Sequence, residues 1–169
     1  MNSYDLTVLP SRHGLHPALD QDPGDVAAAL AGAGRQPEPP ALAEAARRLA
    51  ASAPAWRPRL GAAPGRTRLA WTAGLELWLV EWAPGTVTPV HDHGGAVVAL
   101  TVLDGTLVED CLDATIWTTC RRTTFRAGTA VAFEPGHVHR LAAGGGRPAA
   151  SVHAWSPRWP AGPLPRIGS

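Results

Sequence analysis

Two kinds of hydrophobic periodicity divide this chain of 169 residues, and their order constrains its fold. The first third carries apolar residues at helical spacing, whereas from Thr67 they recur at every second position, as in half-buried strands. The segments with the two-residue period are short and are separated by Gly, Pro or Asp, and they cover 75–82, 96–103, 105–112, 115–122, 128–133, 137–142 and 149–155. Many short strands at this spacing predict a mainly β domain, built as a sandwich or a small barrel.

Two helices are predicted ahead of the strands. Asp22 supplies an N-cap and Pro23 the first position of one helix, which Gly32 can end. Pro40 opens a second helix over 41–52, in which the apolar residues fall on one face. We therefore predict one domain in three parts, namely a helical segment packed on the strands, the strand region and a proline-rich tail, at 1–64, 65–157 and 158–169.

The charges of the chain argue against several classes of partner. The formal net charge is +1, and the 15 Lys and Arg positions are all arginines, scattered along the sequence. This distribution lacks the basic patch that binds nucleic acids or membrane surfaces, so we expect neither as a partner. The apolar runs are too short to span a bilayer, and the N-terminus lacks the charged and apolar regions of a signal peptide. We expect a cytoplasmic protein.

The two cysteines, Cys111 and Cys120, are expected to be reduced thiols. A turn at 113–114 between the two strands that carry them would place position 111 opposite 116, and not opposite 120. A disulfide between the two cysteines is then not expected. We interpret both side chains as small hydrophobic residues of the core.

The candidate chemistry lies in the histidines. His91 and His93 are two residues apart, and so are His137 and His139. Residues two apart on a strand point to the same side, so each pair shares a face. Two such pairs that face each other inside a barrel make a metal site, because neutral imidazole binds iron, zinc, copper or nickel. A single pair of this kind is more commonly an ordinary surface or core feature, so the surrounding residues decide between the two interpretations.

Glycine and proline surround the histidines in two recognisable patterns. The first reads G-T-V-T-P-V-H-D-H over 85–93 and is followed, after an apolar strand, by Gly105. The second reads G-T-A-V-A-F-E-P-G-H-V-H over 128–139. Together they resemble the two signature motifs of the cupin superfamily, whose fold is a small β-barrel or jelly roll. The resemblance makes His139 the third ligand and leaves His137 as a neighbour or an alternative ligand.

A narrower resemblance comes from the residues around these motifs. The chain reads W-A-P-G over 82–85 and T-P-V-H-D-H-G-G over 88–95, and the S-V-H-A-W-S-P of 151–157 is similar to an S-x-H-x-Y-S-P pattern. Arg68, in R-T-R-L-A-W, stands where that pattern's family has Y-x-R-L. The chain thus resembles the bacterial cysteine dioxygenases, type I, over roughly 65–157.

This resemblance implies a cofactor and a reaction. Members of the family hold Fe(II) with three histidines and no carboxylate, which here implies His91, His93 and His139. The expected substrates are O2 and a small thiol-bearing carboxylic acid, such as cysteine or 3-mercaptopropionate, and the product is a sulfinic acid. Metal coordination would deprotonate the thiol. We expect a monomer or a homodimer.

The resemblance also assigns roles to residues outside the metal site. Arg68 would hold the substrate carboxylate with its guanidinium, which is favoured over the alternative of a solvated charge at a strand edge, and Arg66 competes for the role. Ser151, His153 and Trp155 would form a hydrogen-bonded relay toward the iron, while the alternative for His153 is a core histidine bonded to serine. Trp155 replaces the tyrosine of the family, and an indole can donate one hydrogen bond but cannot accept one or ionise.

Three functions therefore compete. The first is a thiol dioxygenase, which the number of matching motifs favours. The second is a divergent three-histidine iron oxygenase of a biosynthetic pathway, acting on another amino-acid-like substrate, which Trp155 and Arg66 favour. The third is a non-catalytic cupin that binds a metal or a small ligand.

Overall fold

The computed structural model describes residue 24 and the ranges 36–52, 56 and 65–158. The first predicted helix lies outside these residues apart from Gly24, and so does the tail beyond Arg158. The division of the chain at 64 and 157 therefore stays a prediction. No helix among the described residues is long and apolar enough to cross a membrane.

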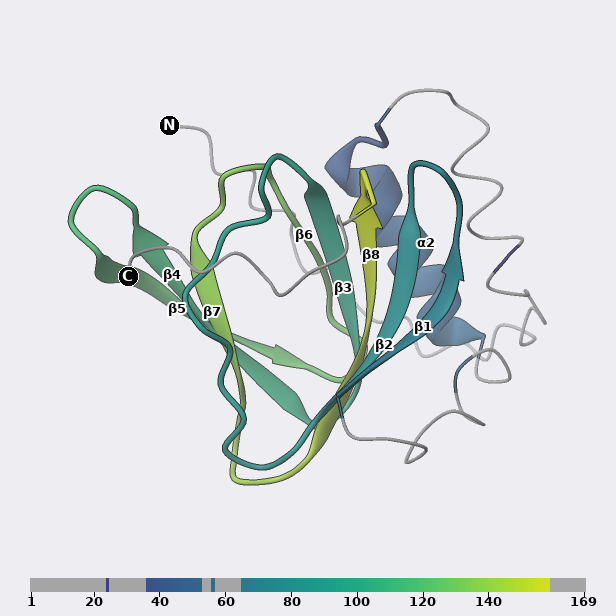
Figure 1. The fold of residues 1–169 in the computed structure, drawn as a ribbon. Coiled ribbons are helices and arrows are strands. Elements are labelled where there is room, and N and C mark those ends of the chain that lie inside the picture. Colours follow the sequence, from purple (N-terminus) through teal and green to yellow (C-terminus); the bar gives the residue numbers. More distant parts are fainter. Residues whose placement is uncertain (1–23, 25–35, 53–55, 57–64, 159–169) are drawn as a thin grey trace.

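The described part contains one long helix followed by eight strands (Figure 1). The helix is α2, Pro39–Ala51, and the strands are β1 Gly65–Trp71, β2 Glu76–Trp82, β3 Val97–Asp104, β4 Thr106–Asp113, β5 Thr118–Arg126, β6 Ala130–Phe133, β7 His139–Ala143 and β8 Ala149–Ser156. The predicted mainly β fold is confirmed, and each segment with the two-residue period became a strand within a few residues of its expected bounds.

The strands form two antiparallel sheets that face each other. A five-stranded sheet has the order β1-β2-β8-β3-β6, and a three-stranded sheet has the order β5-β4-β7. Figure 1 shows the smaller sheet facing the larger one, with α2 on the outer side of the larger sheet. This is the barrel of a single-domain cupin, as the motifs predicted.

Helix α2 covers the outer face of the larger sheet. Two prolines open it, where a missing backbone N–H costs nothing, and its apolar residues repeat every three or four positions. The predicted apolar face is confirmed, since its residues are buried, namely Leu42, Ala45, Ala46 and Leu49. They pack against side chains of the strands behind them, among them Leu77, Leu79, Ala99, Val152 and Ala154.

The opposite face of the same strands looks into the barrel. Because side chains alternate along a strand, the neighbours of the helix-facing residues point inward. Val80, Val98, Leu100 and Trp155 form a second apolar cluster there with Leu107 of the smaller sheet. The larger sheet therefore packs against α2 with one face and contributes the other face to the interior of the barrel.

The hairpin of β4 and β5 departs from the sequence prediction. Asp113 pairs with Thr118 across a loop longer than the predicted turn, and the register shifts by one residue next to Cys111. Cys111 pairs with Arg121, so Cys120 bulges beside it and its Sγ lies 3.6 Å from the Sγ of Cys111. The predicted separation of the cysteines is wrong, and so is their place in the core, since Cys111 is half-buried and Cys120 exposed.

Candidate metal centre

Three of the predicted ligands come together where the two sheets meet. His91 and His93 lie in the loop between β2 and β3, and not on a strand as expected, while His139 is the first residue of β7. An isolated bridge joins the loop to β7, because the backbone N–H groups of His91 and His139 each donate to the other's carbonyl oxygen at 2.9 Å. This pairing brings the imidazole rings of His91 and His139 close together, with 4.8 Å between their centres.

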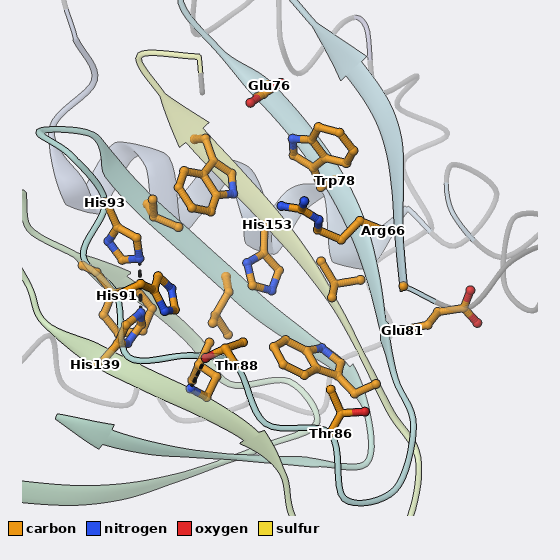
Figure 2. Close-up of a pocket in the computed structure, with 18 of the residues that line it drawn as sticks. Arg66, Glu76, Trp78, Glu81, Thr86, Thr88, His91, His93, His139 and His153 are labelled. Carbon is orange, nitrogen blue, oxygen red and sulfur yellow. Dashed lines mark hydrogen bonds between the residues drawn. The ribbon is translucent and has the colours of Figure 1, made fainter. Parts of the chain in front are cut away.

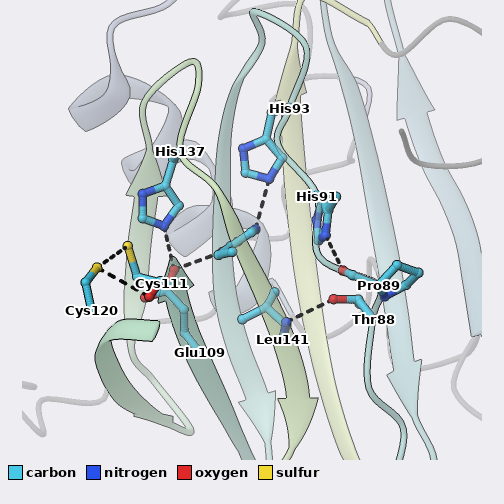
Figure 3. A network of polar contacts seen from close by, with 10 residues as sticks. Thr88, Pro89, His91, His93, Glu109, Cys111, Cys120, His137 and Leu141 are labelled. Atoms are coloured by element: carbon cyan, nitrogen blue, oxygen red, sulfur yellow. Dashed lines mark hydrogen bonds and ion pairs between the residues drawn. The ribbon is translucent and has the colours of Figure 1, made fainter. Parts of the chain in front are cut away.

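The three imidazoles form a buried cluster (Figures 2 and 3). His91, His93 and His139 are 3%, 2% and 0% exposed, and one ring nitrogen of each lies within 4.8 Å of the others. Nε2 of His139 lies 3.2 Å from Nε2 of His93. Three imidazole nitrogens this close together, without a carboxylate among them, fit one transition-metal ion.

Hydrogen bonds orient two of the rings for this task. Nδ1 of His91 donates to the carbonyl oxygen of Pro89 at 2.9 Å, and Nδ1 of His139 donates to Oε1 of Glu109 at 2.8 Å. A neutral imidazole with its hydrogen on Nδ1 has a lone pair on Nε2. Both rings therefore turn a metal-binding nitrogen toward His93, and the residues present fit a metal ion.

The electrostatics of the cluster keep its histidines neutral. Burial, together with the positive charge that neighbouring histidines would carry, lowers the pKa of His93 to about 2. Burial is also the largest cause that lowers the pKa of His139, to about 4, and that lowers the pKa of His91. Because a metal binds the unprotonated imidazole, the cluster is in its metal-binding form at neutral pH.

Glu109 is a functional residue that the sequence reasoning missed. Its Oε1 accepts hydrogen bonds from His139 and, at 2.7 Å, from Nε2 of His137 (Figure 3). Burial raises the pKa of Glu109, but these two hydrogen bonds outweigh burial and bring that pKa to about 2. A signal was present in the sequence, because the alternation of β4 places this acidic residue on the same face as the buried Leu107.

His137, the alternative ligand, directs its Nε2 to Glu109, and its ring centre lies 4.9 Å from that of His139. Its ring stacks on Phe133 with 4.9 Å between ring centres and 17° between planes. Glu109, His137 and His139 also lie close enough to one another to hold an ion. The distances of 2.7 and 2.8 Å between their polar atoms are those of hydrogen bonds, so this group is better described as a support for His139.

The predicted relay residues of β8 are only partly joined. Oγ of Ser151 lies 2.9 Å from Nε2 of His153, as expected, and it accepts a hydrogen bond of 2.9 Å from Nε1 of Trp82. Trp155 meets the ring of His93 edge-on, with 5.2 Å between ring centres. Trp82, which the sequence reasoning did not assign to this chain of contacts, thus stands at its end.

A cavity of about 540 Å³ opens beside the histidine cluster. Both predicted arginines line it, together with residues of the cluster and of β2 and β8, among them His91, His93, His139, His153, Trp78 and Trp155. The guanidinium of Arg66 lies 5.6 Å from the centre of the Trp78 ring, and Figure 2 shows it beside His153. The guanidinium of Arg68 lies 4.3 Å from the centre of the Trp71 ring.

Burial is the main cause that lowers the pKa of His153 to about 3, and the positive charge of Arg66 contributes. His153 is therefore neutral at pH 7, and of the two arginines Arg66 is the one whose charge reaches it.

One solved structure supports the fold. The chain is 19% identical to BH2720 from Bacillus halodurans, over 60% of this chain and 76% of that one, with a TM-score of 0.52, which shows a shared fold and no more. An uncharacterized conserved protein with a double-stranded beta-helix domain from Klebsiella pneumoniae is 22% identical over 57% of this chain and 79% of its own, with a TM-score of 0.48. No curated protein matches the sequence.

The barrel and its three buried histidines define a metal-dependent cupin. The sequence profile described as cysteine dioxygenase type I matches residues 63–163, and the chain belongs to that family. The family and the histidine cluster indicate a metal-dependent oxygenase that acts on a small molecule.

Proposed function

We propose that this protein is a mononuclear non-haem Fe(II) thiol dioxygenase. The reaction joins one O2 to the sulfur of a small thiol-bearing carboxylic acid, R–SH, and gives the sulfinic acid R–SO2H with no other reductant. The observation that supports it is the buried cluster of His91, His93 and His139 on the wall of a cavity that also holds arginine. A cytoplasmic location and a monomeric or homodimeric state remain predictions from sequence.

The three histidines would hold the iron through one ring nitrogen each. The ion, when bound, supplies the coordination positions and the redox chemistry that bring a thiolate and O2 together. Because the three histidines are neutral, they do not offset the positive charge of the ion. This favours an anionic sulfur atom as a further ligand. Glu109 contributes negative charge one residue further out, through the hydrogen bond to His139.

The arginines of β1 would bind the carboxylate of the substrate. A guanidinium offers a planar set of N–H donors that matches a carboxylate. Arg68 is the first candidate for this role and Arg66 the second, and both side chains line the cavity. The guanidinium of Arg66 lies beside His153 (Figure 2), whereas that of Arg68 lies 4.3 Å from the ring centre of Trp71.

The hydroxyl of Ser151 lies between Trp82 and His153. An indole N–H can only donate, so Ser151 accepts from Trp82, and we propose that its own hydrogen is directed to Nε2 of His153. His153 then carries its hydrogen on Nδ1. We propose that this N–H is the group of the relay that holds a proton near the substrate, in place of the phenol that Trp155 cannot supply.

A second candidate is a three-histidine iron oxygenase that acts on a substrate without a thiol. The observation in its favour is Trp155, because the indole narrows the space beside His93 and removes the ionisable group of the family pattern. A non-catalytic cupin that binds a metal or ligand is the third candidate.

Oxygen consumption by the iron-loaded protein distinguishes the three candidates. Uptake of one O2 per thiol with formation of a sulfinate, measured with an oxygen electrode and mass spectrometry, is the result expected for the thiol dioxygenase. Uptake with non-thiol amino acids alone would support the second candidate, and iron binding without any turnover the third. As controls, His139→Ala should lose iron, while His137→Ala should retain it, because His137 points to Glu109 and not to the cluster.

A further inference from the structure

Strand β1 presents two arginines to the same cavity. Arg66 pairs with Val80 and Arg68 with Trp78 on β2, and both partners line the cavity. Side chains two residues apart on a strand share a face, and their Cα atoms are about 7 Å apart. The cavity therefore carries two positive charges side by side along one wall.

Neither of these two charges is neutralised within the described part of the chain. Four other arginines form ion pairs with carboxylates at 2.6 to 3.1 Å, namely Arg47, Arg48, Arg122 and Arg140. For Arg66 and Arg68, no carboxylate of a described residue lies within the 4.0 Å that defines such a pair. Their guanidinium groups lie instead over the ring of Trp78, at 5.6 and 5.7 Å from its centre.

Contacts with an aromatic face leave the N–H donors of a guanidinium available at its edge. Two glutamates also line the cavity, but Figure 2 shows Glu76 and Glu81 toward opposite ends of β2, with Arg66 between them. The part of the cavity wall whose positive charge is not neutralised thus lies between the carboxylates of Glu76 and Glu81. Two adjacent guanidinium groups with free donors are suited to two anionic groups on one ligand.

The two arginines are both exposed residues, but they differ in their neighbours. Figure 2 shows the guanidinium of Arg66 beside the buried His153. Arg68 lies 4.3 Å from the ring centre of Trp71, whose side chain is 56% exposed. A ligand that bridges both would reach from the histidine cluster toward the solvent, and the cavity of about 540 Å³ is larger than a three-carbon thiol acid fills.

We propose that the cavity selects a thiol that carries two anionic groups, such as a thiol dicarboxylate, with Arg66 binding the inner group and Arg68 the outer one. This inference rests on the proposed thiol dioxygenase function and names its substrate class. The reaction is unchanged, since the thiol sulfur gains both oxygen atoms of O2 and the two carboxylates take no part in the redox step.

The substrate test compares 2-mercaptosuccinate with the two molecules that lack one of its carboxylates, 3-mercaptopropionate and 2-mercaptopropionate. The iron-loaded protein should oxidise the dicarboxylate with a kcat/KM at least tenfold above both. Arg68→Gln should lower kcat/KM for the dicarboxylate about 10- to 100-fold, as expected for a lost charged hydrogen-bond pair, and bring the preference close to one. Arg122→Gln, on the outer side of β5, is the matched control and should leave the preference intact.

A binding measurement separates this inference from the proposed function. Calorimetry on the iron-loaded protein without O2 should show succinate binding at least tenfold tighter than propionate, and Arg68→Gln should remove the difference. If the monocarboxylic thiols are oxidised as efficiently as 2-mercaptosuccinate, or if succinate and propionate bind equally, the two-anion pocket is wrong while thiol oxidation stands. If succinate binds selectively but no thiol is oxidised, the reaction is wrong and the two-anion pocket stands.

Discussion

Glu109 connects the third histidine of the cluster to the wall of the smaller sheet. It is 1% exposed, and its carboxylate accepts hydrogen bonds from two histidines that approach from the neighbouring strand and loop. A carboxylate in this position fixes the ring of His139 and makes its other nitrogen a stronger ligand. The three-histidine site thus has an acidic residue after all, but as a support for a ligand and not as a ligand.

Replacement of Glu109 by glutamine should weaken metal binding. The amide keeps the shape of the side chain but loses the charge that holds the Nδ1 hydrogen of His139, and we expect the affinity for Fe(II) to fall about 10- to 100-fold. An anaerobic metal titration measures this change. The matched control is Asp110→Asn, which removes the ion pairs with Arg122 and Arg140 on the other face of β4. Equal metal affinity in Glu109→Gln and the wild type would contradict the assignment.

The buried histidines predict how the stability of the metal-free protein depends on pH. The pKa is about 2 for His93 and about 4 for His139 in the folded state, below the 6.5 of an unfolded histidine. Below pH 6.5 the unfolded chain therefore binds protons that the folded chain does not, and the free energy of unfolding falls as pH falls. Glu109, whose pKa is also lowered, adds a further loss below its usual value of 4.5.

Urea unfolding at a series of pH values measures this effect. Between pH 6.5 and 4, each of the two histidines contributes up to about 1.4 kcal/mol per pH unit to the loss of unfolding free energy. The metal-free variant His93→Gln, which lacks one of the two groups, should show a shallower dependence. An unfolding free energy that stays constant from pH 7 to pH 5 would show that the histidines are not buried as described.

At the scale of the elements, the hairpin of β4 and β5 brings two thiols together. The Sγ of Cys120 lies 3.6 Å from that of Cys111, and it also donates to the carbonyl oxygen of Cys111 at 3.3 Å. Figure 3 shows the pair next to Glu109. The bulge that makes this contact is a local irregularity of β5.

Mild oxidation should therefore link Cys111 and Cys120. A small closing motion brings the sulfur atoms to bonding distance, and Cys120 is exposed to oxidants. We expect treatment with diamide to lower the mass by two hydrogens and to protect both thiols from alkylation in intact-protein mass spectrometry. Cys120→Ser should leave a single thiol that alkylates under both conditions. Two free thiols after oxidation of the wild type would rule out the contact.

The elements also show what could be predicted from the sequence. The strands followed from alternation, and the candidate ligands His91, His93 and His139 from short local motifs, because both signals depend on neighbouring positions. The contacts of Glu109 with His139 and of Trp82 with Ser151 span 30 and 69 residues, so no local pattern predicts them. The one-residue bulge beside Cys111 has no composition signal, and it overturned the predicted position of both cysteines.

At the scale of the whole molecule, the histidine cluster joins two segments that lie far apart in the sequence. His91 and His93 lie on the loop between β2 and β3 of the larger sheet, while His139 belongs to β7 of the smaller one, to which the loop is bridged. An ion held by all three would resist separation of this loop from β7. Binding to the folded state alone stabilises a protein in proportion to the logarithm of the free ligand concentration.

Addition of Fe(II) without O2 should therefore raise the melting temperature. At a concentration one hundred times the dissociation constant, the gain is about 2.7 kcal/mol, which corresponds to roughly 5–10 °C for a chain of this length. Differential scanning calorimetry measures the shift, and a chelator should reverse it. His139→Ala should show no shift, whatever its own melting temperature. A shift of the same size in that variant would place the bound ion elsewhere.

The two faces of strand β8 serve different purposes, one in the interior of the barrel and one in the core under α2. His153 and Trp155 line the cavity and Ser151 lies on the same face of the strand, while Val152 and Ala154 between them pack under α2. A single-residue deletion within this strand would exchange the two sets, sending polar side chains into the core and aliphatic ones to the metal. Insertions and deletions here would thus destroy folding and chemistry together, whereas the exposed turn at 145–147 before the strand can change length without disturbing either.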